Sequence, residues 1–151
     1  MTSISANDRK VAIVMSEFNS VITESLLNGA TDAFFHNGGT EDNLKVYKVP
    51  GAIEIPGAVS QVLRHQQVDA IVTLGAVIRG GTRHFDYVAG ECANGVSELS
   101  RNHDIPIIFG VLTTDDLQQA LERAGTKASN KGWEAMEAAL ATCDTYREIR
   151  S

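Results

Sequence analysis

Residues 75–88 read GAVIRGGTRHFDYV, and this stretch decides how the rest of the chain is organised. The apolar run AIVTL at residues 70–74 leads into it, two consecutive glycines follow, and the last residues have helical spacing. A strand that passes through a glycine-rich turn into a helix is the basic unit of a parallel α/β sheet. The sequence therefore predicts a strand, a turn and a helix at this position.

The turn Gly80-Gly81-Thr82 has the features of an anion-binding site. Backbone N–H groups at the start of a helix, together with the positive end of its dipole, attract phosphates and carboxylates. Glycines also let the backbone approach a ligand closely. The sequence has neither GxxxxGK[ST] nor the full GxGxxG pattern, so a single phosphate or carboxylate fits better than ATP or NAD. A tight turn without a ligand explains the same residues equally well.

His84 opens the helix predicted after this turn, and Arg79 and Arg83 flank it. The helix dipole and the two arginines favour a neutral imidazole, which is able to accept a proton and return it. A surface histidine that merely opens a helix is the alternative of equal weight.

Apolar runs typical of strands alternate four times with helical patterns along the chain. Strands are predicted at residues 11–15, 44–49, 70–74 and 105–112, each followed by a helix, with a further helix at the C-terminus. This order indicates right-handed βαβ units and a parallel sheet covered by helices on both faces. Ligands bind such sheets outside the carboxyl ends of the strands. Four polar or glycine-rich segments fall there and are predicted to converge: 17–19, 51–54, 75–84 and 113–116.

Local chemistry predicts several helix boundaries. Ser20 or Thr23 is expected to cap the first helix, and the glycine pair at 38–39 to end it. Thr113 or Thr114 is expected to cap the short fourth helix.

Composition argues against several classes of protein. The 151 residues carry a net charge of −6, which does not suit an extended nucleic-acid-binding surface. The sequence has no run of about 18 apolar residues, and its N-terminus lacks the apolar core of a signal peptide, so no membrane association is expected. Cys92 and Cys143 are predicted to be buried thiols of a cytoplasmic protein. The four histidines lack the spacing of a metal site, and no metal is expected.

Four other side chains are candidates for binding. Phe18 follows the first strand and would serve as a stacking platform for a planar ring, although a core position is more common for phenylalanine. Glu54 lies among prolines and glycines, where it would accept hydrogen bonds from a polyol or remain solvated at a helix start. Arg123 and Lys131 flank the linker at 125–130 and, taken alone, are ordinary surface charges.

Several runs together resemble the 6,7-dimethyl-8-ribityllumazine synthase family, which acts in the penultimate step of riboflavin biosynthesis. They occur in order from residue 11 to the last helix, and the combination of RGGTxHF with RAGTK is highly specific. The matching runs are EFN at 17–19, PGAIEIP at 50–56, GAVIRGGTRHFDYV at 75–88, FGVLT at 109–113, ERAGTK at 122–127 and NKG at 130–132.

The resemblance implies both a fold and a reaction. The fold is a flavodoxin-like three-layer αβα sandwich, a single domain at 1–151 with four parallel strands in the order 2-1-3-4 and an added N-terminal strand shared between subunits. The reaction condenses 5-amino-6-(D-ribitylamino)uracil with 3,4-dihydroxy-2-butanone 4-phosphate. It gives 6,7-dimethyl-8-ribityllumazine, phosphate and water, and it needs no cofactor.

The resemblance also implies a role for each matching position. The pyrimidine ring would stack on Phe18 beside Asn19, and the ribityl chain would lie along the segment formed by Ala52, Ile53 and Glu54. The backbone edge that reads the pyrimidine is formed by Ala76, Val77 and Ile78.

The remaining roles concern the phosphate and the proton. Gly81 and Thr82 would contact the phosphate, and His84 would donate and accept the proton. A neighbouring subunit would supply Phe109 and Arg123, and Arg123 would pair with the phosphate. Lys131 would be a further ligand at the pyrimidine end.

Assembly is implied at the level of the family. Its members form homopentamers, and some join twelve pentamers into an icosahedral shell that associates with riboflavin synthase. Two positions depart from the common pattern: Ile53 replaces an aromatic residue and Ser129 replaces a glycine. The uninterrupted linker resembles the shell-forming kind, whereas Ser129 and the short N-terminal arm argue against a shell, so pentamer, decamer and shell stay open. The alternatives to the enzyme are a non-catalytic flavin or lumazine binder, a structural shell protein and a flavodoxin-like phosphosugar isomerase.

Overall fold

The computed structural model describes residues 4–80, 84–125 and 129–151. Within this part of the chain the sheet has four strands, all paired in parallel, in the order β2-β1-β3-β4. This confirms the predicted flavodoxin-like α/β fold and its strand order. The strands are β1 (Val11–Ser16), β2 (Leu44–Val49), β3 (Ala70–Ile78) and β4 (Ile107–Thr114).

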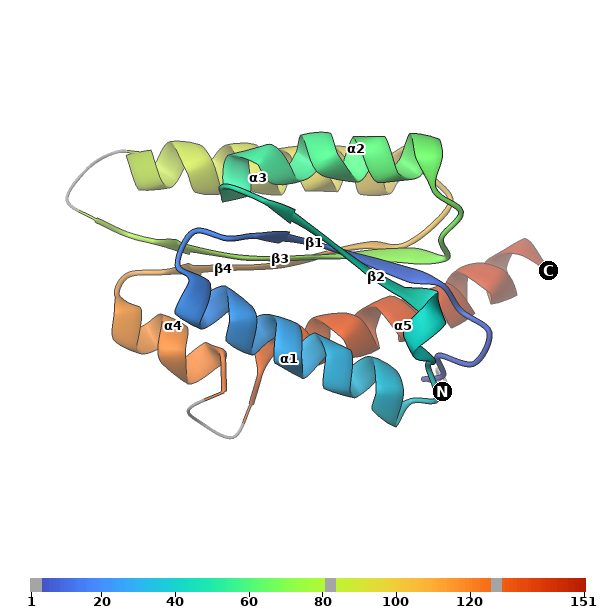
Figure 1. Cartoon of the computed structure of the whole chain (residues 1–151). Coiled ribbons are helices and arrows are strands. Elements are labelled where there is room, and N and C mark those ends of the chain that lie inside the picture. The colour runs from blue at the N-terminus through green and yellow to red at the C-terminus, as the bar shows by residue number, and fades with distance from the viewer. Residues whose placement is uncertain (1–3, 81–83, 126–128) are drawn as a thin grey trace.

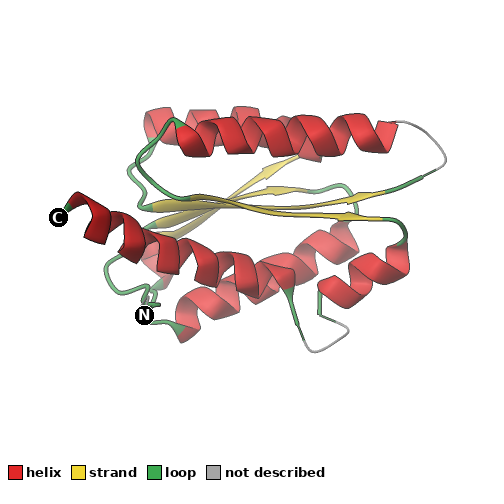
Figure 2. Ribbon diagram, turned by 180° about the vertical axis from the view of Figure 1, so that it is seen from behind, coloured by secondary structure: helices red, strands yellow, loops and turns green. Residues whose placement is uncertain are grey.

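Helices cover the sheet on both faces (Figure 1). The view from behind shows the same three layers (Figure 2). One face carries α1 (Ser20–His36), α4 (Leu117–Arg123) and α5 (Lys131–Arg150). The other face carries α2 (Ile55–His65) and α3 (His84–Arg101), and α2 follows a short 3₁₀ turn at Ala52–Glu54.

The central strand β1 is fully buried because both of its faces are covered. Ile13 and Met15 pack in the cluster that includes α1 and α5, whereas Ala12 and Val14 pack in the cluster beneath α2 and α3. Successive side chains of a strand point to opposite faces, so a continuous apolar run is the pattern that such a strand requires.

Strand β3 is longer than predicted. The sequence-based boundary was Leu74, but the strand runs through Gly75 to Ile78. The reason is pairing with β4, whose register matches Gly75 with Val111 and Ile78 with Thr114. The rim of the sheet therefore lies further along the chain than local sequence indicates.

Two predicted caps are wrong. Thr113 and Thr114 belong to β4, and the N-cap of α4 is Asp116, whose Oδ1 accepts a hydrogen bond from the backbone N of Gln119 at 2.8 Å. At α1 the N-cap is Asn19, in the left-handed conformation at φ 65°, and Ser20 is the first helical residue.

The two cysteines are free and buried, as predicted from the sequence. Burial raises the pKa of the Cys92 thiol to about 11, and it also raises the pKa of the Cys143 thiol. In the described part of the chain, every helix is too short or too polar to cross a bilayer.

The described part of the N-terminal arm packs near the amino ends of the strands. Ala6 is buried and its backbone N donates to the carbonyl of Asn37 at 2.8 Å. The backbone N of Lys10 donates to a carboxylate oxygen of Asp69 at 2.7 Å. The addition of an N-terminal strand to a neighbouring subunit stays a prediction.

Candidate active site

A cavity of about 450 Å³ opens at the carboxyl ends of β1 and β3. These strands are neighbours, but β1 continues through α1 to β2 on one side and β3 continues through α3 to β4 on the other. This is the topological switch point, where open α/β sheets bind their ligands. The described residues that line the cavity are Phe18, Asn19, Pro50, Gly51, Ala52, Ile53, Glu54, Ala76, Val77, Ile78, Gly80, His84, Phe85 and Val88.

The turn after β1 presents Phe18 to solvent. Its side chain is 71% exposed, which is unusual for so large an apolar group, and it lies at the mouth of the cavity. Its backbone N donates to the carbonyl of Pro50 at 3.0 Å. The side-chain amide of Asn19 donates to the carbonyl of Ala76 at 3.3 Å, so this turn is tied to both neighbouring strand ends. The core position considered for Phe18 is therefore excluded.

The turn after β2 holds Glu54 in place. Its carboxylate Oε1 accepts a hydrogen bond from the backbone N of Gly51 at 2.9 Å, and its own backbone N donates to the carbonyl of Gly51 at 3.1 Å. This reciprocal pair fixes the 3₁₀ turn that precedes α2. Ala52 is buried within the turn, whereas Ile53 is partly exposed at the cavity.

The third wall consists of the end of β3 and the start of α3. Ala76, Val77 and Ile78 line the cavity, and His84 and Phe85 enter it from the first turn of α3. Gly81 and Thr82, the predicted phosphate contacts, lie outside the described residues. The site thus brings together a planar apolar platform, a carboxylate, a strand edge and an imidazole.

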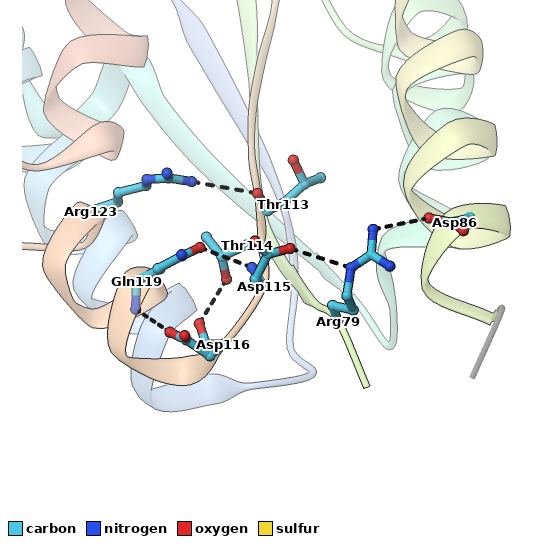
Figure 3. A network of polar contacts seen from close by, with 8 residues as sticks. All are labelled: Arg79, Asp86, Thr113, Thr114, Asp115, Asp116, Gln119 and Arg123. Carbon is cyan, nitrogen blue, oxygen red and sulfur yellow. Dashed lines mark hydrogen bonds and ion pairs between the residues drawn. The ribbon is translucent and has the colours of Figure 1, made fainter. Parts of the chain in front are cut away.

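Arg123 and Lys131 line a different cavity of about 330 Å³, together with Thr113 and Ser129. A guanidinium N–H of Arg123 donates to the carbonyl of Thr113 at 3.5 Å (Figure 3). Phe109 packs partly buried in the core cluster beneath α2 and α3. None of these residues belongs to the described lining of the first cavity.

The four polar or glycine-rich segments lie at the same edge of the sheet, as predicted. Residues 113–116 follow β4 and contact the end of β3, where the backbone N of Arg79 donates to the carbonyl of Thr114 at 2.8 Å. Only the other three segments contribute described residues to the lining of the first cavity.

The sequence interpretation also missed several residues of the wall. Gly80, Phe85 and Val88 line the cavity, but Gly80 was considered only as part of the anion-binding turn, and Phe85 and Val88 were given no role. Their position next to His84 was the available signal, since a helix that starts at a site presents its first turns to it.

A family model described as 6,7-dimethyl-8-ribityllumazine synthase matches residues 8–147. The chain belongs to the 6,7-dimethyl-8-ribityllumazine synthase family. A 6,7-dimethyl-8-ribityllumazine synthase from Campylobacter jejuni is 48% identical over 143 residues, which cover 95% of this chain and 93% of the relative. The protein of that name from Nautilia profundicola is 49% identical over 142 residues, covering 94% and 92% of the two chains.

Membership in the 6,7-dimethyl-8-ribityllumazine synthase family confirms the identification made from the sequence motifs. The match includes both cavities, because residues 8–147 contain Phe18 near one end and Lys131 near the other. The roles of individual side chains stay predictions.

Proposed function

We propose that the chain condenses 5-amino-6-(D-ribitylamino)uracil with 3,4-dihydroxy-2-butanone 4-phosphate to form 6,7-dimethyl-8-ribityllumazine. Phosphate and water are released, and the product is the precursor of riboflavin. The observation that carries this proposal is the cavity at the switch point, where Phe18, Glu54 and His84 lie together in a member of this family. Imine formation, phosphate elimination and ring closure are the three steps required.

The pyrimidine substrate is proposed to bind in this cavity. Its ring stacks on the exposed face of Phe18, and its edge binds backbone groups of residues 76–78. Its ribityl hydroxyls reach the turn at Ala52–Glu54, where the carboxylate of Glu54 accepts hydrogen bonds. Two substrates held side by side react as if in one molecule, which contributes much of the rate.

The phosphate substrate binds next to His84. Gly81 and Thr82, which lie outside the described residues, are expected to contact the phosphate, and Arg123 supplies a charge that offsets the negative charge growing on the leaving phosphate. His84 carries the proton between substrate atoms. Arg123 lines the second cavity, and we infer that it completes the site of a neighbouring subunit, together with Phe109. Lys131, which lines the same cavity, is the further ligand at the pyrimidine end.

We propose that the basic assembly is a homopentamer in which each site is shared by two subunits. We also propose that it acts in the cytoplasm. The buried free thiols suit a reducing compartment. Light scattering and negative-stain electron microscopy distinguish a pentamer from a decamer or an icosahedral shell. A shell would provide a compartment for riboflavin synthase.

The direct test follows lumazine formation by absorbance after both purified substrates are mixed with the full chain. We expect product and one phosphate per turnover, with no product when either substrate is omitted. Tight binding of riboflavin or lumazine without turnover would instead support the non-catalytic binder.

Replacing His84 by alanine is expected to lower kcat by about 10²-fold, the lower end of the range for general acid–base catalysis. The variant should keep part of its activity, because the other residues of the cavity still hold the two substrates together. The matched control is His65→Ala, at the exposed far end of α2. Steady-state kinetics of both variants test this role. Equal kcat values for the two variants would exclude His84 as the group that transfers the proton.

A further inference from the structure

Arg79 lies where three segments of the chain meet. Its backbone N donates to the carbonyl of Thr114 at 2.8 Å, just beyond the end of β3. Its guanidinium lies between two carboxylates, with Nε 3.3 Å from Oδ1 of Asp115 and Nη2 3.7 Å from Oδ1 of Asp86 (Figure 3). The same group lies 4.9 Å from the ring centroid of Phe85. Arg79 therefore joins the first turn of α3 to the loop between β4 and α4.

Both of these joined segments lead to proposed site residues. On one side, Phe85 lines the first cavity and directly follows His84. On the other side, the backbone N of Asp115 donates to the side-chain oxygen of Gln119 at 3.0 Å, which ties the loop to α4. Helix α4 ends in Arg123. A chain of contacts thus connects the turn that carries His84 with the helix that carries Arg123.

The surroundings of Arg79 do not suit a direct phosphate ligand. Two carboxylates offset its single positive charge. The described lining of the first cavity includes Ile78 and Gly80, on either side of Arg79, but not Arg79 itself. The pairs are also exposed, and exposed ion pairs contribute little to the free energy of unfolding. Bridging two carboxylates while stacking on a ring requires the planar guanidinium, which lysine cannot replace.

We propose that Arg79 is a positioning residue, which fixes the turn carrying His84 relative to the loop that leads to Arg123. This inference rests on the proposed function, which gives those two residues their roles. In the proposed assembly, His84 and Arg123 of one chain serve two neighbouring sites, and a small displacement of either group lowers the reaction rate at its own site strongly. Because Arg79 acts through its neighbours, its loss lowers kcat more than it raises the KM of either substrate.

The kinetic test uses Arg79→Ala, Asp115→Ala and the double variant, with each substrate varied in turn. We expect kcat to fall roughly tenfold in Arg79→Ala. The double variant should be no slower than the slower single variant, because both changes remove the same contact. Arg79→Lys should behave more like Arg79→Ala than like the unchanged protein. The matched control is Arg101→Ala, an exposed arginine at the other end of α3.

Two kinetic outcomes would overturn the proposal. A higher KM for the phosphate substrate with unchanged kcat would make Arg79 a direct ligand. Fully additive effects of the Arg79 and Asp115 changes would show that the contact between them has no role.

Amide hydrogen exchange of the native protein tests the positioning role of Arg79 independently of activity. Faster exchange at residues 84–91 and 115–121 is expected in Arg79→Ala but not in Arg101→Ala. Unchanged exchange rates in both segments would contradict the proposal that Arg79 fixes these segments. If the unchanged protein makes no lumazine while exchange responds as expected, the proposed function fails and the structural link remains.

Discussion

Replacing Gly132 by alanine is expected to lower the free energy of unfolding by about 3 kcal/mol or more, the upper range for overpacked sites. Gly132 lies buried in the first turn of α5, against α1. A Cβ atom at this position would overlap the carbonyl oxygen of Leu26 and lie 2.7 Å from its carbonyl carbon. The obstacle is backbone inside a helix, so it cannot move aside as the end of a flexible side chain does.

The surrounding hydrogen bonds prevent α5 from shifting to make room. The side-chain oxygen of Asn130 accepts from the backbone N of Gly132 at 2.8 Å and of Trp133 at 3.1 Å. Its amide nitrogen donates to the carbonyls of Ser25 at 3.1 Å and Ala124 at 2.9 Å. A shift of α5 away from α1 would break this set, in addition to the packing of the two helices.

Thermal unfolding measured by circular dichroism at one protein concentration checks the prediction. For a chain of this length, 3 kcal/mol corresponds to a Tm lower by about 6–12 °C. The matched control is Gly90→Ala in α3, where an added Cβ meets nothing within 4 Å. That change should leave Tm the same or raise it, since alanine favours helices over glycine by about 1 kcal/mol. Equal Tm values for the two variants would contradict the packing argument.

The architecture could be predicted from the sequence because it depends on patterns that are local. The apolar runs at 11–15 and 70–74 are long enough for buried strands, and their alternation with helical patterns specifies a parallel sheet. The strand ends could not be predicted in this way. β3 continues through Gly75 because β4 offers pairing partners, and this is a property of two segments that are distant in the sequence.

The same distinction applies to the candidate site. Phe18, Glu54 and His84 could be placed together because each follows a strand or opens a helix beside the switch point. The environment of Arg79 could not be predicted. In the sequence it is a basic residue beside a glycine turn, interpreted only through its effect on the charge of His84, whereas Asp115 and Asp86 are brought to it only by the fold.

Replacing Arg123 by alanine is expected to lower kcat/KM for 3,4-dihydroxy-2-butanone 4-phosphate by about 10²–10³-fold, the loss typical of one donor to a developing anion. The guanidinium carries five N–H donors, and its hydrogen bond to the carbonyl of Thr113 is long at 3.5 Å, so this bond does not hold the group tightly. The KM for the pyrimidine substrate should change little, because the residues proposed to bind the ring and the ribityl chain do not include Arg123. The exposed Arg64→Ala is the matched control.

Mixed assemblies decide which subunit supplies Arg123. His84→Ala and Arg123→Ala are each expected to be nearly inactive, but pentamers reassembled from both chains would contain intact sites wherever an unchanged His84 meets an unchanged Arg123 of the neighbour. Random mixing of equal amounts in a ring should make about a quarter of the sites intact. Activity well above that of either variant alone is therefore expected after co-refolding. If Arg123 instead acted within its own chain, no mixture would exceed the average of the two variants, and the shared site would be excluded.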